Sequence, residues 1–392
     1  MERLIAKYEK KLVDAGLAEP GAPLLAGLDA ELIFNRRDPA TSELAKIFDG
    51  LHINSLLYCR PAEPYRTIVD YLSARGQTIT PEDCETRTFQ HDIPVAGRFA
   101  AEDILAGLRR RKSVIIPGAG VIAHGVVSPE QAFVTYSSVL FACFVKFFGD
   151  YLTALEAGRS GRPGRPDAAF AAAFDRAVAH LDPVRPAPPL LAKGPFTSAA
   201  QVYEALDQAG KATVDFRLVD SFFGNISYCL DDVLYISQTG SSLDELPGHV
   251  DPCPLDGSSC AGLTASSEFS AHAQVVLTSK VRAILHGHPK FSVLMSMRCA
   301  KKECEARGAC HLKCPDQRRL GDVPVVPGEV GSGPTGLCNT MPAAMRGQRA
   351  VMVHGHGLFA VGETDFNEPF ATLLAVENAS REAYFRAVAE LS

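Results

Sequence analysis

The chain has 392 residues, 46% hydrophobic and 21% charged, which is the balance of an ordinary globular protein too long for one small core. Its net charge of -6 argues against a nucleic-acid groove and against an anionic membrane as partners. The sequence shows no apolar run of the roughly eighteen residues that a membrane-spanning helix needs. The N-terminus predicts an amphipathic helix rather than a signal peptide, so we expect a cytoplasmic protein with reduced thiols.

Segments rich in proline and glycine predict a division into two domains. Residues 158–166 repeat Gly, Arg and Pro and cannot hold regular structure. A short helix rich in Ala and Phe is predicted at 167–180, and a second Pro-rich stretch follows at 183–195. We therefore expect a first domain at 1–156, a linker with a short helix at 157–196, and a second domain at 197–392.

Helical and strand patterns alternate in the second domain, which indicates a mixed α/β fold. Ser198 and Gln201 form a capping box that opens the first helix, and Gly210 is expected to end it. The predicted helices lie at 201–209, 270–278 and 367–391, and the predicted strands lie at 214–218, 233–236 and 281–285.

Histidines two residues apart follow the apolar strand at 281–285. His286 and His288 project to the same side of an extended chain, so they can hold one metal ion between them. A second strand signal carries His354 and His356, again two residues apart. Three imidazoles and a nearby carboxylate form the ligand set of a catalytic zinc site, which leaves one position open for substrate. The alternative is that these are ordinary core or loop histidines.

Five short motifs occur in a fixed order. They are Gly224-Asn225-Ile226-Ser227, Thr239-Gly240-Ser241-Ser242-Leu243, Ser266-Ser267-Glu268, His286-x-His288-Pro289 and His356-Gly357-Leu358. Each motif is weak alone, but their order from about residue 198 to the C-terminus resembles the class II aldolase/adducin family, of the fuculose-phosphate aldolase and ribulose-phosphate epimerase type. The resemblance implies a three-layer α/β/α fold, with a central, mainly antiparallel sheet between helix layers.

The resemblance also implies roles for single residues. Zinc, or another divalent metal, would be held by His286, His288 and His356, with His354 as a supporting or alternate ligand. Glu268 would be the general acid/base that delivers or removes a proton at carbon. The alternative for Glu268 is a carboxylate that only stabilises a helix N-terminus. His272, four residues after Glu268, is expected to be a structural histidine.

A phosphate-binding region is implied by the same resemblance. Backbone N–H groups in glycine turns, together with hydroxyl donors, suit a phosphate oxyanion. The sequence departs from the family where Ser221-Phe222-Phe223 replaces hydroxyl-rich residues, which indicates a larger or more apolar substrate. The alternative is that these residues form structural turns only. The candidate phosphate-binding residues are Gly224, Asn225, Thr239, Gly240, Ser266 and Ser267.

These residues predict a metal-dependent aldolase-type lyase. It would cleave or form a C–C bond in a small hydroxy-carbonyl substrate, with a sugar phosphate as the expected class, through a zinc-stabilised enediolate. An epimerase, dehydratase or decarboxylase of the same family would use the same groups. A non-catalytic adducin-like scaffold, or a redox or metal sensor, is the alternative from another class. We expect a small-molecule substrate, no nucleic acid or membrane partner, and a homo-oligomer.

The two halves of the sequence resemble each other, which predicts two tandem class II aldolase-like domains. Residues 113–125 align with 350–362, and 57–61 align with 285–289. In the first half the three ligand positions are therefore occupied by Tyr58, Arg60 and Ala119. None of these is a good zinc ligand, and an arginine repels a dication. We expect the first half to be a degenerate copy without metal. The alternative is a coincidental pattern of apolar residues and glycines.

A cysteine-rich insertion is unusual for the family. The chain has eleven cysteines, an odd number that cannot all pair within one chain. The spacing in the insertion fits neither a zinc ribbon nor a ferredoxin motif, so a second zinc, an iron–sulfur cluster, redox thiols and inert thiols all stay open. Cys253 and Cys260 could also approach the cysteines of the insertion. The insertion contains Cys299, Cys304, Cys310 and Cys314.

Overall fold

The structure is a computed structural model that describes most of the chain. It divides into two compact units, of which the first comprises Met1–Glu82, Thr86–Pro183 and Leu391–Ser392, and the second comprises Asp83–Glu85 and Val184–Glu390. The main division thus falls inside the segment that we expected to be a linker. The described residues are 1–159, 165–219, 222–258, 263–299, 301, 303–329, 331 and 333–392. Ser221, Cys260 and linker residues 160–164 lie outside them.

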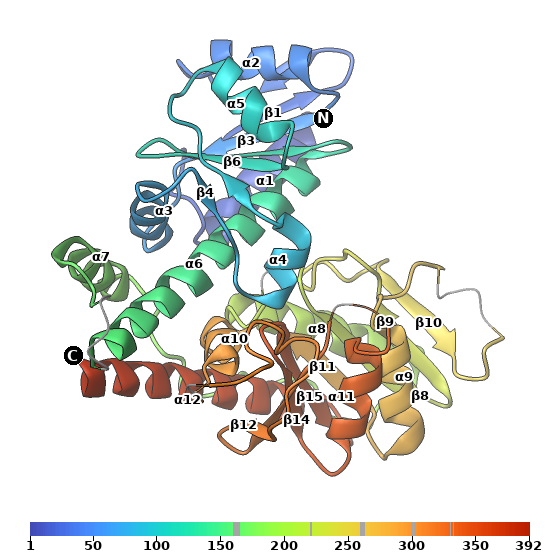
Figure 1. Cartoon of the computed structure of the whole chain (residues 1–392). Helices are drawn as coiled ribbons and strands as arrows, with labels where there is room; N and C mark the ends of the chain where they lie inside the picture. The colour runs from blue at the N-terminus through green and yellow to red at the C-terminus, as the bar shows by residue number, and fades with distance from the viewer. Residues whose placement is uncertain are drawn as a thin grey trace. The chain divides into compact units, whose positions relative to one another are not determined.

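The first unit contains a five-stranded antiparallel sheet with the strand order β2-β1-β3-β7-β6 (Figure 1). A two-stranded ribbon, β4-β5, is connected to β6 by a parallel bridge between Val95 and Ile115. The strands are β1 (Leu24–Leu28), β2 (Leu32–Phe34), β3 (Ser55–Cys59), β4 (Thr78–Ile79), β5 (Ile93–Pro94), β6 (Ser113–Ile116) and β7 (Gly120–Gly125). The helices are α1 (Glu2–Asp14), α2 (Thr41–Gly50), α3 (Tyr65–Ser73), α4 (Cys84–Gln90), α5 (Ala101–Leu108), α6 (Pro129–Arg159) and α7 (Ala168–Ala179).

The helix α6 corrects one expectation from the sequence. It contains an 18-residue window with a mean hydropathy of 1.6, so it is long and apolar enough, by length and composition alone, to cross a membrane. However, 83% of that window is buried. Phe133 and Phe147 of α6 pack against Tyr8 and Tyr71 of the same unit, as expected of a core helix. Sequence hydropathy does not distinguish a buried core helix from a spanning one, because both are apolar on all sides.

The helix predicted at 167–180 is present as α7, and it packs on the first unit. Asp167 is its N-cap and accepts a hydrogen bond from the backbone N–H of Phe170. Phe170 stacks on Tyr71, and Phe174 stacks on Tyr151 with ring centroids 3.7 Å apart. These aromatic contacts attach the helix to α3 and α6, so α7 is part of the first unit and not of a linker.

The second unit contains an eight-stranded sheet with the order β10-β9-β8-β11-β15-β14-β13-β12. All neighbouring strands are antiparallel except β13 and β14. The strands are β8 (Asn225–Leu230), β9 (Val233–Ser237), β10 (Val250–Pro254), β11 (Ala283–Gly287), β12 (Arg318–Leu320), β13 (Val323–Val326), β14 (Ala350–Val353) and β15 (Gly357–Gly362). This mainly antiparallel sheet matches the expected architecture.

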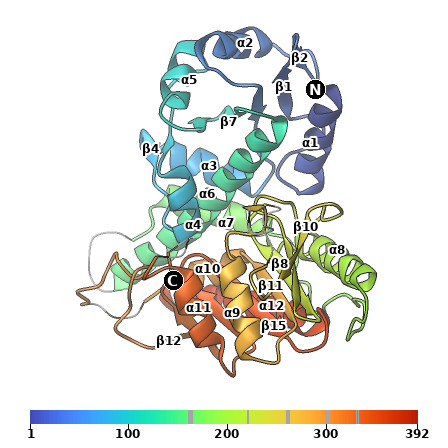
Figure 2. The same cartoon turned by 90° about the vertical axis from the view of Figure 1, so that its right-hand side faces the viewer.

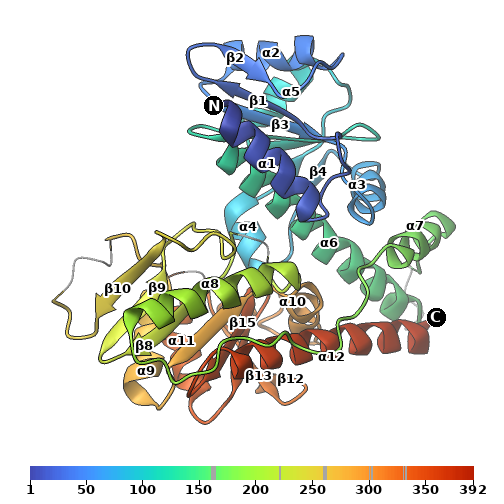
Figure 3. The ribbon, with the colours of Figure 1, turned by 180° about the vertical axis from the view of Figure 1, so that it is seen from behind.

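Helices cover both faces of this sheet. Figure 2 shows α9 and α11 on one face, and Figure 3 shows α8 and α12 on the opposite face. Val275 of α9 and Met341 of α11 form a buried cluster with Ile284, Val351 and Phe359 of the sheet. The second unit is therefore the three-layer α/β/α arrangement that the sequence predicts. Its helices are α8 (Ala199–Asp215), α9 (Phe269–Thr278), α10 (Lys290–Met297), α11 (Leu337–Met345) and α12 (Asn367–Leu391).

Two local predictions for the start of this unit are wrong. The helix α8 begins at the expected cap, where the Ser198 side chain accepts from the backbone N–H of Gln201, but it continues through Gly210 to Asp215. The strand predicted at 214–218 is therefore absent. Gly210 does not end the helix. It is instead a position where the backbone of another segment packs closely against the helix. A Cβ atom at that position would lie 2.1 Å from the carbonyl oxygen of Leu243.

The two sheets share strand order and register. The order β2-β1-β3-β7-β6 corresponds to β9-β8-β11-β15-β14. Tyr58 pairs with Ile122 in the first sheet, and His286 pairs with Phe359 in the second, as the sequence alignment of the halves requires. The parallel bridge from Val95 likewise corresponds to the parallel pairing of β13 with β14. This likeness supports the proposal that one fold was duplicated.

Candidate metal centre

Adjacent strands bring three histidines together at one edge of the second sheet. His286 lies in β11, and His288 follows that strand by one residue. His356 lies in the turn that joins β14 to β15, one residue before β15 begins. Because β11 and β15 are paired neighbours, the end of one strand lies beside the start of the other. Residues that are far apart in sequence therefore meet at one place.

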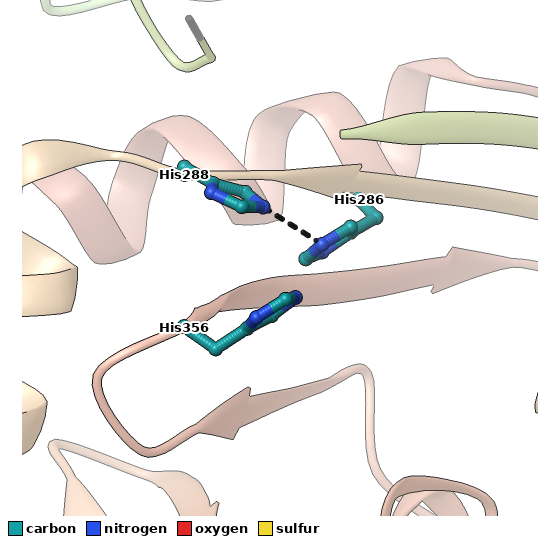
Figure 4. Close-up of side chains that lie close together, drawn as sticks. All are labelled: His286, His288 and His356. Atoms are coloured by element: carbon teal, nitrogen blue, oxygen red, sulfur yellow. Dashed lines mark hydrogen bonds between the residues drawn. The ribbon is translucent and has the colours of Figure 1, made fainter. Parts of the chain in front are cut away.

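The three imidazoles converge with metal-binding geometry (Figure 4). The Nε2 atoms of His286 and His288 are 3.0 Å apart, and one ligand atom from each of the three histidines lies within 4.8 Å of the others. The rings of His286 and His356 are parallel, with centroids 5.2 Å apart. All three residues are at most 3% exposed, so this is an internal site and not a surface cluster.

A carboxylate completes the group. Glu268 is the N-cap residue of α9 and is 7% exposed. Its Oε1 atom lies 3.3 Å from Nε2 of His356, and its Oε2 atom lies 3.7 Å from Nε2 of His286. Asn225 donates from Nδ2 to Oε2 over 2.6 Å, which fixes the orientation of the carboxylate. Glu268 therefore lies at the helix N-terminus and beside the imidazoles at once, although its side chain makes no capping hydrogen bond to the helix.

The electrostatics of the group favour binding of a cation. Burial lowers the pKa of His286 to about 4 and that of His288 well below its usual value, so both rings are neutral near pH 7. Burial acts to raise the pKa of Glu268, but interactions with His286, His356 and Asn225 outweigh burial and lower it. Burial acts to lower the pKa of His356, but its flanking carboxylates raise it well above the usual value. Neutral imidazoles and an ionised carboxylate are the forms that bind a metal, and His286, His288 and Glu268 are in these forms. His356 reaches its binding form by releasing the proton that the two carboxylates hold on it.

The residues fit a tetrahedral divalent ion. Zinc–nitrogen bonds of about 2.0–2.1 Å place neighbouring ligand atoms roughly 3.3 Å apart in a tetrahedron. Three of the separations, at 3.0, 3.3 and 3.7 Å, are near that value, and the ligand atoms of the three histidines all lie within 4.8 Å of one another. Both ring nitrogens of His356 are buried, and within the described part of the chain neither makes a hydrogen bond of good geometry. A buried polar atom of this kind indicates a missing partner, and a metal ion would supply it.

The candidate phosphate-binding residues lie on two sides of this group. A Cβ atom at Gly224, where φ is +119°, would lie 2.6 Å from the carbonyl oxygen of His286, so the turn runs against the metal-binding strand. Asn225 pairs with His286 in the sheet, and its side chain binds Glu268 rather than pointing away.

The hydroxyl residues lie on the Glu268 side. Thr239 donates to the carbonyl of Ala265, and the backbone N–H of Glu268 donates to Oγ of Ser266. Gly240 adopts a positive φ of +70°, and Ser267 is exposed.

Other residues singled out by the sequence lie outside the group. His272 is fully buried and lies 2.8 Å from Oγ of Ser227 through Nδ1, which is a structural contact. His354 does not join the three clustered histidines. In the described part of the chain, the cysteines of the insertion are free, and they do not gather as a further group of three metal-binding side chains. A second metal at Cys299, Cys304, Cys310 and Cys314 stays a prediction.

A protein-family model matches most of this unit. The model of the class II aldolase and adducin N-terminal domain matches residues 204–384. These residues belong to the class II aldolase/adducin family. Its aldolases generally use a divalent metal, zinc. Comparison with curated proteins finds no match to the chain.

Solved structures resemble about half of the chain. L-fuculose-1-phosphate aldolase from Thermus thermophilus is 24% identical with a TM-score of 0.39, and the match covers 49% of this chain and 98% of that one. YgbL from Klebsiella pneumoniae, a putative aldolase/epimerase/decarboxylase, is 23% identical with a TM-score of 0.38, and the match covers 50% of this chain and 100% of that one. The N-terminal class II aldolase domain of a Thermoplasma acidophilum protein is 15% identical with a TM-score of 0.35 over 49% of this chain and 96% of that one.

Three further residues lie beside the histidines, and only Phe223 among them was singled out by the sequence. Phe359 stacks on His286 with ring centroids 3.8 Å apart, and Phe223 stacks near His288 at 6.0 Å. Glu85 lies 3.1 Å from Nδ1 of His356, although it is far away in sequence. The alternation of β15 could have located Phe359, but no local pattern could have located Glu85.

Proposed function

We propose that the second unit is a metal-dependent lyase of the class II aldolase type. It would cleave or form a C–C bond in a small hydroxy-carbonyl compound. The observation that carries the proposal is the buried convergence of three imidazoles and the Glu268 carboxylate on one point. A non-catalytic member of the fold has no need to keep four such groups desolvated in one place.

The metal would be held by His286, His288 and His356. When bound, a divalent cation supplies a Lewis acid for the substrate carbonyl and its neighbouring hydroxyl. Phe359 holds the ring plane of His286 through stacking, and the carbonyl of Leu358, 3.1 Å from Nδ1, sets that ring's orientation. The strand pairing of β11 with β15 therefore fixes the ligands before any ion arrives.

Glu268 would move a proton at the substrate carbon next to the carbonyl. Its carboxylate is oriented by the amide of Asn225, and its contacts with the histidines favour the ionised form, which is the form that a general base needs. The same carboxylate is within 3.7 Å of two imidazole nitrogens, so it is also a candidate ligand that substrate would displace. Both roles place Glu268 at the reacting atoms.

A phosphorylated substrate suits the surroundings of the site. The backbone turn at Gly224 lies against His286, and the hydroxyl of Ser266 accepts from the backbone N–H of Glu268. Thr239 donates to the carbonyl of Ala265, the residue before Ser266. The aromatic ring of Phe223 beside His288 adds an apolar surface, which favours a substrate with an apolar part. We further propose a cytoplasmic homo-oligomer, with a first unit that is a degenerate, metal-free copy.

Epimerisation, dehydration and decarboxylation form a second set of candidates, because they would use the same metal and the same carboxylate. An assay of retro-aldol cleavage against a panel of phosphorylated ketoses, with zinc added, tests the proposal. We expect aldehyde formation with at least one ketose phosphate, and we expect Glu268→Gln to keep the metal while abolishing turnover. Products of epimerisation or CO2 release without aldehyde would select a sibling reaction instead. No conversion of any kind by the zinc-loaded protein would refute the enzyme proposal.

A further inference from the structure

A carboxylate from the N-terminal half of the sequence lies beside a candidate metal ligand. Residues Asp83–Glu85 belong to the second unit, although they are followed by the rest of α4 in the first. Oε2 of Glu85 lies 3.1 Å from Nδ1 of His356, and the Glu85 side chain is only 16% exposed. The backbone N–H of Cys84 donates to the carbonyl oxygen of Gly355 over 2.6 Å, which fixes the segment against the turn that carries His356.

Glu85 and Glu268 contact opposite nitrogens of the same ring. Glu268 lies near Nε2, on the side where the other imidazoles converge, whereas Glu85 lies near Nδ1. Glu85 is therefore placed behind the ligand and does not compete with a metal for the open side. His286 has the same arrangement, because its Nδ1 lies 3.1 Å from the carbonyl oxygen of Leu358 while its Nε2 faces the group.

An acceptor at Nδ1 has a defined effect on a metal-binding histidine. It holds the ring proton on Nδ1, leaves the Nε2 lone pair free for the metal, and fixes the ring plane. A carboxylate does this more strongly than a carbonyl, because its negative charge also makes the imidazole a better donor.

In the second half of the chain, β12 and β13 are joined by the short turn at Gly321 and Asp322. The corresponding strands of the first half, β4 and β5, are instead separated by α4, which supplies Glu85.

We propose that Glu85 is a positioning residue for the metal centre, acting through Nδ1 of His356. The proposal rests on the proposed function only in that the three histidines bind a divalent ion. Through this residue the N-terminal half of the sequence contributes a side chain to the site. The segment that carries it, between β4 and β5, has no equivalent in the C-terminal half. Removing the Glu85 carboxylate should weaken metal binding without removing any ligand.

The test is the zinc affinity of the full-length protein, measured by competition with a chromophoric chelator. We expect Glu85→Ala to raise the Kd for zinc by about 10- to 100-fold. Glu85→Gln, whose amide oxygen can still accept from Nδ1 but carries no charge, should show a smaller increase. The matched control is Glu102→Gln, an exposed glutamate in the first turn of α5, which should bind zinc like the unmodified protein.

Two further readouts separate positioning from a general loss of structure. The absorption bands of bound Co2+ should shift in Glu85→Ala and stay unchanged in Glu102→Gln. In the presence of a chelator, Glu85→Ala should still melt cooperatively, and the increase in Tm caused by zinc should be smaller than in the unmodified protein. Zinc affinity and Co2+ bands that are unchanged in Glu85→Ala would overturn the proposal while leaving the metal site intact. Absence of metal binding by the unmodified protein would instead refute the proposed function itself.

Discussion

Gly357 is a glycine because two ligand rings pack against its backbone, and replacing it with alanine tests the geometry of the site directly. A Cβ atom at this position would lie 2.5 Å from Cε1 of His286, 2.6 Å from the carbonyl oxygen of Gly287 and 2.8 Å from Cδ2 of His288. Ordinary van der Waals contact begins near 3.4 Å. The His286 ring would therefore have to move by about 0.9 Å, which is 3.4 minus 2.5.

A movement of this size is large for a metal site. Ligand distances in such sites vary by only about 0.2 Å, and a misplacement of about 1 Å costs on the order of 100-fold in activity. Overpacking should also cost roughly 1–3 kcal/mol in the free energy of unfolding. For a protein of this size, that lowers Tm by a few degrees, on the order of 2–4 °C per kcal/mol.

The assay compares zinc affinity and Tm of Gly357→Ala with those of Gly97→Ala. Gly97 is the matched control, because nothing lies within 4 Å of a Cβ atom placed there. We expect Gly357→Ala to bind zinc roughly 10- to 100-fold more weakly and Gly97→Ala to bind it normally. A folded Gly357→Ala protein with normal zinc affinity would show that His286 and His288 are not the ligands.

Three further predictions concern polar groups that are buried or half-buried. Glu377 accepts from the backbone N–H and hydroxyl of Ser292 at the start of α10, so Glu377→Ala should lower the unfolding free energy in urea by about 2–4 kcal/mol; a loss below about 0.5 kcal/mol would contradict this role. Burial lowers the pKa of His272 to about 4, so between pH 6.5 and 4 the unfolded chain binds a proton that the folded chain does not. The free energy of unfolding of the chelator-treated protein should therefore fall as pH drops through this window, by up to roughly 3 kcal/mol from this residue. His272→Gln should reduce the slope of unfolding free energy against pH, and equal slopes in the two proteins would exclude this role for His272. Asn225→Ala should lower kcat by roughly tenfold with little change in zinc affinity, because it removes the amide that orients Glu268; an unchanged kcat would show that Glu268 needs no such support.

The cluster of three histidines was largely predictable from the sequence, because its members lie in or directly beside strands. A spacing of two residues on a strand puts His286 and His288 on one side, and the apolar run before them correctly predicted β11. The helices α9 and α12 were also predicted within a residue or two at each end. Local pattern is sufficient where one element alone sets the position of a side chain.

Prediction failed where contacts distant in sequence decide the outcome. Gly210 looked like a helix end, but it lies inside α8, where the backbone of Leu243 leaves no room for a side chain. Helix α6 is buried by its own unit, which hydropathy along the sequence cannot show. Glu85 reaches the site only through the tertiary structure, so no motif near His356 could indicate it. These three cases depend on packing, which a single sequence does not specify locally.

The metal content of the purified protein tests the central claim most directly. Zinc analysis should find about one ion per chain in the unmodified protein and almost none in the His286→Ala/His288→Ala double variant. Variants of Cys304 and Cys310 serve as the control and should keep the zinc. A double variant that still carries its full complement of metal would place the ion elsewhere, and would contradict a catalytic centre built on these histidines.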